Sequence, residues 1–149
     1  MNKAYTKYGI FTAAGLIVYF LAVKLVGLHE NPWLRILNGL IMAAGIYLAI
    51  KKEKEDRGKS FDYYAGARTG IYTGFLATII FTIFMAVYMF HLDSGFAENI
   101  MDNWVRDYYQ GAEILLFVIS VEGFASTVVL TLAFMQKFKP SQNIRKKAS

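Results

Sequence analysis

The chain has 149 residues, of which 56% are hydrophobic, 16% aromatic and only 18% charged, with a formal net charge of +5. Water-soluble domains are about 45–50% apolar and about 25% charged, so this composition excludes an ordinary soluble domain. The 12 Phe and 10 Tyr residues exclude a disordered chain, and the absence of cysteine excludes a disulfide scaffold and a thiol nucleophile. We therefore expect an integral membrane protein.

Four stretches are predicted to be membrane-spanning helices, because a helix needs about 20 mostly apolar residues to cross the hydrocarbon. They cover residues 8–28, 33–50, 69–90 and 111–135. Their apolar residues are continuous rather than alternating, which favours helices over a β-barrel. The first stretch has an alternative interpretation as a signal peptide, but it is long for one and lacks a small-residue cleavage site. We predict one all-α membrane domain over residues 1–149, built as a four-helix bundle.

The distribution of Lys and Arg predicts the orientation, because cytoplasmic loops of membrane proteins are enriched in these residues. With both termini in the cytoplasm, the outer side keeps only Lys24, Arg35 and Arg106 of the 16 basic residues. The inner side then holds a cytoplasmic loop over 51–68 and a basic cytoplasmic tail over 136–149. Contact with anionic lipid explains the tail better than nucleic-acid binding, so we expect no nucleic-acid partner.

A further helix is predicted between the third and fourth spans. Its aromatic and aliphatic residues recur every four positions, which places them on one helical face: Phe96, Ile100, Trp104 and Tyr108. We predict a short amphipathic outer helix over 94–109, lying at the membrane surface. Its apolar face either docks on its own bundle, which we favour, or binds a partner.

Small residues spaced by four recur in two of the predicted spans. The second span carries Gly39 and Ala43, and the third begins with Gly66, Gly70 and Gly74. Lipid gives no hydrophobic drive to helix pairing, so close approach of backbones matters and small residues permit it. The pattern indicates packing inside one bundle, which we favour because the other spans must pack against something, or homodimerisation through the third span.

One carboxylate is predicted to lie inside the membrane. Glu122 is about 22 Å along its helix from Lys137, within a hydrocarbon core about 30 Å thick. A charge there costs at least about 2.5 kcal/mol, so Glu122 must be protonated, hydrated or paired. Lys24 and Arg35 fall at a similar depth and Glu113 nearer the outer surface, which predicts an ionisable cluster. We favour an ion pair that fixes helix register; the alternative is a proton or ion relay.

No catalytic constellation is present. The chain has no HExxH, no GxSxG, no Walker loop and no GxGxxG that opens a helix after a strand. The only two histidines, His29 and His91, fall at span ends and are a weak metal signal. We therefore predict a protein that is not an enzyme and that has no cofactor and no metal site.

The segment that enters the third span resembles a known family. Residues 58–70 read Gly-Lys-Ser-Phe-Asp-Tyr-Tyr-Ala-Gly-Ala-Arg-Thr-Gly, which is similar to a bacterial membrane family catalogued as domain of unknown function 4199 and typical of Bacteroidota. The resemblance covers nearly the whole chain and implies a four-span inner-membrane protein. That family has no assigned activity, so the resemblance implies no catalytic residue.

Two functional hypotheses follow. The first is an accessory or scaffold subunit of an inner-membrane assembly, or a self-associating bundle, in contact with the lipid bilayer and with other membrane subunits. The second is a small proton- or ion-coupled transporter centred on the intramembrane Glu122. A membrane enzyme is disfavoured because no residue set supports one.

Overall fold

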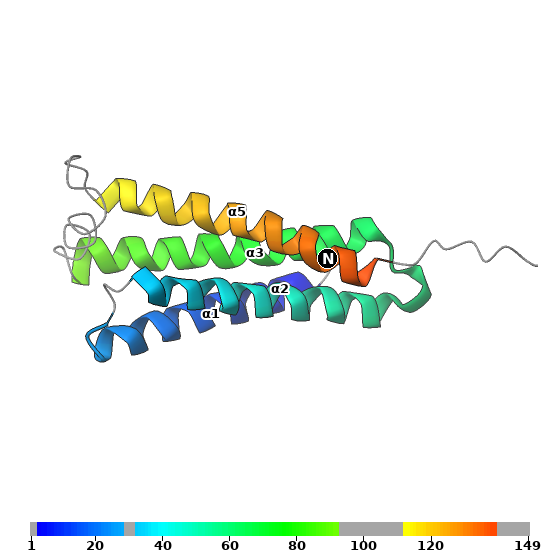
Figure 1. The fold of residues 1–149 in the computed structure, drawn as a ribbon, viewed down its shortest axis with the longest axis horizontal. Coiled ribbons are helices and arrows are strands. Elements are labelled where there is room, and N and C mark those ends of the chain that lie inside the picture. The colour runs from blue at the N-terminus through cyan, green and yellow to red at the C-terminus, as the bar shows by residue number, and fades with distance from the viewer. Residues whose placement is uncertain (1–2, 29–31, 93–111, 140–149) are drawn as a thin grey trace, which may run out of the picture.

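Four long helices form an elongated bundle in the computed structural model, which describes residues 3–28, 32–92 and 112–139 (Figure 1). The helices are α1 (Lys3–Leu25), α2 (Arg35–Arg57), α3 (Tyr63–Val87) and α5 (Ala112–Phe138). Short 3-10 turns, η1 (Pro32–Leu34) and η2 (Gly58–Ser60), precede α2 and α3, and the π-helical η3 (Tyr88–Leu92) extends α3. Successive long helices run in opposite directions (Figure 1). The predicted all-α fold with four packed helices is confirmed; the outer helix predicted over 94–109 lies outside the described residues.

The number of spans differs from the prediction. Three helical segments are long and apolar enough to cross a membrane: Ala4–Leu25, Tyr63–Leu92 and Glu113–Phe138. The predicted span over 33–50 is not among them. Its apolar stretch lies between Arg35 and Lys51 and rises only about 22 Å, short of a hydrocarbon core about 30 Å thick.

Helix α2 continues through the charged residues that were expected to form a loop over 51–68. Lys and Glu are good helix formers, and pairs spaced by four add support; Lys52 Nζ lies 2.8 Å from Asp56 Oδ1. The helix ends at Gly58, whose φ of 52° favours glycine. Asp62 then caps α3, because its Oδ1 accepts a hydrogen bond from the Ala65 N–H at 2.8 Å. The connection between the two helices is therefore only residues 58–62.

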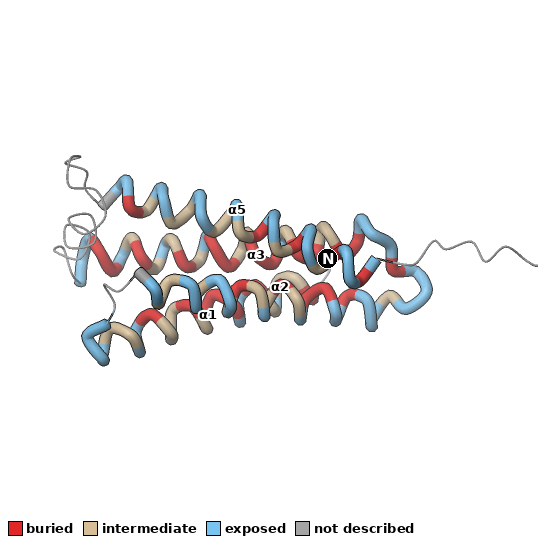
Figure 2. Tube along the Cα trace, viewed as in Figure 1, coloured by how far each residue is buried: buried red, intermediate tan, exposed pale blue. Residues whose placement is uncertain are grey.

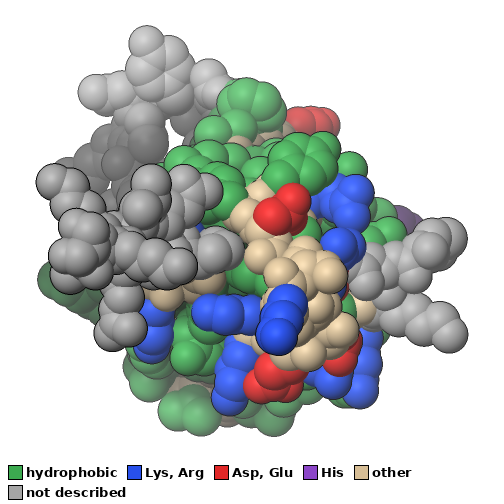
Figure 3. Space-filling view, turned by 90° about the vertical axis from the view of Figure 1, so that its right-hand side faces the viewer, with side chains coloured by type: hydrophobic (Ala, Val, Ile, Leu, Met, Phe, Trp, Pro, Cys, Tyr) green, Lys and Arg blue, Asp and Glu red, His purple; other side chains and the backbone are tan. Residues whose placement is uncertain are grey.

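The end of the bundle where α2 and α3 join is rich in charge. Lys and Arg side chains gather there, interspersed with Asp and Glu (Figure 3). Glu53 is only 1% exposed and its carboxylate pairs with Arg57 one turn later. Lys54 donates to the carbonyl oxygen of Phe138 at 3.3 Å, which ties the last turn of α5 to α2. We call this the charged end of the bundle; α1 begins toward it and α5 ends at it (Figure 1).

Helices α3 and α5 pack closely, because glycines on one helix face larger residues on the other. A Cβ on Gly70 would lie 2.6 Å from Thr131 Cγ2, and one on Gly66 would lie 2.6 Å from Met135 Sδ. Gly74 faces Thr127 in the same register. One turn further the roles reverse, and Thr78 of α3 faces Gly123 of α5. The α3 residues of this seam are buried and Gly123 is half-buried; Figure 2 shows the buried face of α3 that looks toward α5. The glycine series of the third span therefore packs inside the bundle, against α5.

Candidate functional site

We call the end of the bundle opposite the charged end its outer end. Helix α2 begins short of this outer end. The Tyr19 hydroxyl donates to the carbonyl oxygen of Leu34 at 2.9 Å, so the first turn of α2 lies beside Tyr19 of α1. Tyr19 precedes the end of α1 at Leu25 by about 9 Å of helix rise. Along α5, Glu122 lies within about 5 Å of the middle of a 27-residue helix. A bilayer centred on α5 therefore places this level in hydrocarbon.

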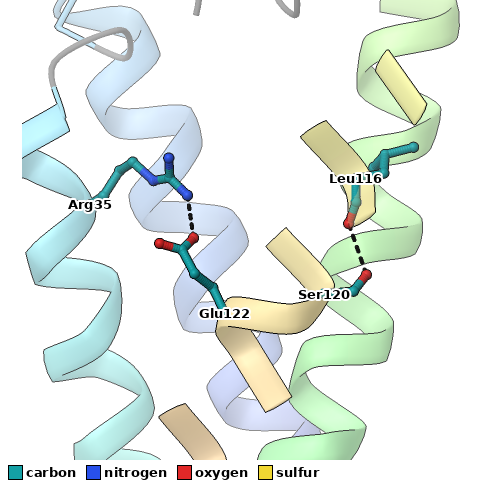
Figure 4. A network of polar contacts seen from close by, with 4 residues as sticks. All are labelled: Arg35, Leu116, Ser120 and Glu122. Carbon is teal, nitrogen blue, oxygen red and sulfur yellow. Dashed lines mark hydrogen bonds and ion pairs between the residues drawn. The ribbon is translucent and has the colours of Figure 1, made fainter. Parts of the chain in front are cut away.

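At this level a salt bridge joins α2 to α5. The Arg35 guanidinium donates from Nη2 to Oε2 of Glu122, and the two side chains point toward one another from α2 and α5 (Figure 4). The Arg35 side chain is 27% exposed and that of Glu122 is 59% exposed. Ser120 of the same helix points the other way, toward α3, and its hydroxyl donates to the Leu116 carbonyl at 2.9 Å (Figure 4). The ion pair thus occupies the face of α5 that looks toward α2.

The structure brings together two of the four residues of the predicted ionisable cluster. Lys24 lies nearer the outer end than Arg35, with its Nζ 4.5 Å from the centroid of the Tyr88 ring, a cation–π contact. Glu113 is exposed on the first turn of α5. Among the described residues no ion pair joins either of them to Glu122. Of the four predicted residues, the described part of the chain therefore brings only Arg35 and Glu122 into contact with each other.

A cavity of about 190 Å³ lies beside the pair in the outer half of the bundle. All four long helices contribute to its wall. Most of the lining is apolar, including Leu16, Phe20, Met42, Phe81, Met85 and Leu115. Gly39 and Glu122 line the cavity and are also exposed, so it reaches the surface between α2 and α5. Nearer the charged end these two helices contact directly, with the Tyr47 and Phe138 ring centroids 5.1 Å apart.

Two residues that line the cavity each carry a buried polar atom with no hydrogen-bond partner within the described residues. The two atoms are Oδ1 of Asn38 and Oγ1 of Thr78. Sequence reasoning missed both residues. The available signal was a polar side chain inside each apolar span, one turn after Arg35 and one turn after Gly74.

Gly39 does not pack as predicted. A Cβ built on it meets no atom of the described residues within 4 Å, whereas Gly66, Gly70 and Gly74 all face α5 closely. Ala43 is half-buried. The backbone of α2 is therefore exposed at Gly39, beside the place where the cavity reaches the surface between α2 and α5.

The fold and this site define a small multi-span membrane protein. The chain belongs to the family described as Protein of unknown function (DUF4199), whose model matches residues 7–114, and the resemblance found in the sequence is thereby confirmed. The match includes Lys24 and Arg35 and ends before Glu122. No curated protein and no solved structure gives a match.

Proposed function

We propose that this protein is a non-catalytic accessory or scaffold subunit of a bacterial inner-membrane assembly, with both termini in the cytoplasm. The outer halves of α2 and α5 are the face that binds a transmembrane helix of the partner. The observation that carries the proposal is the Glu122 carboxylate, which is 59% exposed at a level expected to lie in hydrocarbon.

Lipid is a poor environment for this carboxylate. A carboxylate near the middle of a spanning helix costs about 2.5–3.5 kcal/mol on insertion scales, and Arg35 compensates it from one side only. Polar side chains of a neighbouring helix, such as Ser, Thr, Asn or Gln, stabilise such a group by hydrogen bonds. Because Arg35 already neutralises the charge, the partner needs polarity here rather than a charge of its own.

The exposed backbone at Gly39 also supports the outer halves of α2 and α5 as the face that binds the partner helix. Helices in membranes associate where small residues let backbones approach closely. The glycines of α3 pack inside the bundle, whereas no atom in the described part of the chain lies within 4 Å of a Cβ built on Gly39. A helix docked against α2 would cover both Gly39 and the exposed side of the ion pair.

A second function, a small proton- or ion-coupled transporter centred on Glu122, is favoured by one observation. The cavity of about 190 Å³ adjoins the Glu122 carboxylate and is lined by residues of all four long helices. Intramembrane carboxylates beside cavities serve as ion sites in transporters. Against this function, the Glu122 carboxylate is already bound to a guanidinium, which competes with any transported cation.

Purification of the tagged protein in mild detergent tests the proposal. Wild type is expected to carry a stoichiometric partner, and Glu122→Gln and Arg35→Ala are expected to lose it. Ile79→Ala, an exposed position on α3, is the matched control and should keep it. If Glu122→Gln keeps the partner and its thermal stability but abolishes uptake or efflux in vesicles, the transporter is correct and the scaffold is wrong.

A further inference from the structure

We propose that Arg68 and the tyrosines around it bind the phosphate group of an anionic phospholipid at the charged end of the bundle. The tyrosines are Tyr64 and Tyr72 of α3 and Tyr5 of α1. This goes beyond the proposed assembly role, because the site lies toward the other end of the bundle from the partner-binding face and its ligand is a lipid.

The position of Arg68 along α3 places it at the edge of the hydrocarbon. The uncharged stretch from Thr69 to Phe90 rises about 30 Å, which matches the thickness of a hydrocarbon core. Arg68 directly precedes this stretch and therefore lies at the level of the lipid phosphates. Tyr64 and Tyr72 lie one turn to either side of it on the same helical face, and tyrosine is enriched at the membrane interface.

The guanidinium of Arg68 is held against an aromatic ring. Its Cζ lies 5.8 Å from the centroid of the Tyr64 ring, a cation–π contact, and the residue is half-buried. The planar group that stacks on a ring keeps its N–H donors at its edge, where a phosphate can accept two of them. Tyr64 and Tyr72 are 70% and 48% exposed, so the stack lies at the bundle surface.

A second helix borders the site. The Tyr72 ring meets the Tyr5 ring of α1, with the centroids 5.4 Å apart. These two rings lie one turn deeper along the bundle than Arg68, where the acyl chains of a bound lipid begin. The site therefore offers a cation for the phosphate and, below it, an aromatic surface for the apolar part of the same molecule.

The carboxylates of the charged end are already engaged. Glu53, Glu55 and Asp56 each pair with a basic residue one turn away on α2, and Asp62 caps α3. Within the described residues no carboxylate pairs with Arg68. A lipid phosphate supplies the missing counter-charge, and an anionic lipid supplies it better than a zwitterionic one, whose phosphate already has a cation beside it.

The test is native mass spectrometry of the full chain released from micelles that contain equal amounts of phosphatidylglycerol and phosphatidylcholine. We expect wild type to retain phosphatidylglycerol about tenfold better than phosphatidylcholine, the effect of a charged hydrogen bond. Inorganic phosphate at millimolar concentration should not displace it, because free phosphate lacks the apolar chains that contact the tyrosines.

Three variants isolate the guanidinium. Arg68→Gln should abolish the preference for phosphatidylglycerol, and Arg68→Lys, which keeps the charge without the planar fork, should retain only part of it. Lys137→Gln is the matched control and should leave the preference unchanged. It also removes a cation stacked on a ring, because Lys137 Nζ lies 5.3 Å from the Tyr47 centroid, but between α5 and α2. Melting temperatures equal to that of wild type in phosphatidylcholine show that the variants fold.

Three results overturn the inference. Equal retention of the two lipids by wild type means that the site does not select an anion. Equal losses in Arg68→Gln and Lys137→Gln mean that the charged end attracts anionic lipid without a site. Displacement by inorganic phosphate means that the ligand is a soluble phosphate. Because this assay contains no other protein, none of these results bears on the proposed assembly role.

Discussion

Arg35, the first residue of α2, is joined by its guanidinium to the carboxylate of Glu122, 87 positions later and near the middle of α5. Helix α2 has no acidic residue in its first turn, and its N-cap, Leu34, offers no side-chain hydrogen bond. The N-terminal end of a helix carries a partial positive charge, so the carboxylate also compensates the dipole of α2. The pair therefore holds the outer end of α2 on α5 where the two helices otherwise enclose a cavity.

We expect Arg35 and Glu122 to be energetically coupled. In a double-mutant cycle of Arg35→Ala, Glu122→Ala and the double variant, the coupling free energy should be about 0.5–3 kcal/mol. Each single variant leaves a charge without its partner, whereas the double variant leaves none. The measurement is reversible unfolding in detergent micelles. Strictly additive effects would show that the pair does not stabilise the bundle.

The seam between α3 and α5 predicts that Gly74→Ala is destabilising. Its new methyl group would collide with Thr127, which is fully buried and whose hydroxyl donates to the Gly123 carbonyl at 2.7 Å. Overpacking of this kind costs about 1–3 kcal/mol. Thermal unfolding in detergent measures the loss, and adding Thr127→Ala should recover part of it.

Gly39→Ala is the control for Gly74→Ala, because Gly39 lies outside the seam between α3 and α5. Nothing in residues 3–28, 32–92 and 112–139 lies within 4 Å of a Cβ at this position, and alanine is the better helix former by about 1 kcal/mol. The isolated protein should be as stable as wild type or slightly more so. If Gly39→Ala and Gly74→Ala lower the melting temperature equally, the assignment of the seam is wrong.

At the charged end of the bundle we predict an asymmetry between the partners of a buried pair. Arg57→Ala leaves the Glu53 carboxylate, which is 1% exposed, without the guanidinium, and should destabilise more than Glu53→Gln, which removes the buried charge. The hydrogen bond and charge of Glu53 raise the pKa of Arg57 above its usual value. A raised pKa keeps the guanidinium charged below that value, so the asymmetry should persist across neutral and moderately alkaline pH. Denaturation midpoints at pH 7 and pH 9 test both statements, and equal effects of the two substitutions would contradict them.

Helix α2 is not among the three helices apolar enough to span alone, but it returns the chain along the bundle between α1 and α3. The alternating directions of the four helices therefore predict that both chain ends lie on one side of the membrane, and the Lys and Arg distribution makes that side the cytoplasm. A green fluorescent protein fused to either end should therefore fluoresce, and alkaline phosphatase fused to either end should be inactive. The opposite activities at one end alone would mean that an odd number of segments crosses the bilayer.

The pairing of Arg35 with Glu122 was predictable from depth along the predicted spans, but the cluster around it was not. Counting residues places Lys24 at the depth of Arg35 only if α1 ends and α2 begins at the same level of the bundle. In the structure α2 begins beside Tyr19, so Lys24 lies nearer the outer end and contacts Tyr88 instead. The start of a helix depends on the packing of the preceding turn, which composition does not reveal.

The α3 seam was only half predictable. The spacing of Gly66, Gly70 and Gly74 indicated a packing surface, but its partner was missed, although Gly123 and Thr127 repeat the same spacing on α5. Gly39 belonged to the same pattern, but a Cβ built on it meets nothing within 4 Å among the residues that the structure describes. A small residue permits close approach without specifying a neighbour. The cavity was not predictable at all, because its volume depends on how side chains of four helices fill the space.

Site-specific cross-linking in native membranes tests the central claim, that the outer halves of α2 and α5 bind a partner helix. The chain contains no cysteine, so single-cysteine variants give unambiguous attachment points. Gly39→Cys and Ser126→Cys place a thiol-linked photo-cross-linker on this face, and Val18→Cys places one on an exposed position of α1. The first two should give one discrete adduct of a partner with the 16.9 kDa chain, and Val18→Cys should give none. Monomer alone at all three positions, or the same adduct at all three, would contradict the claim.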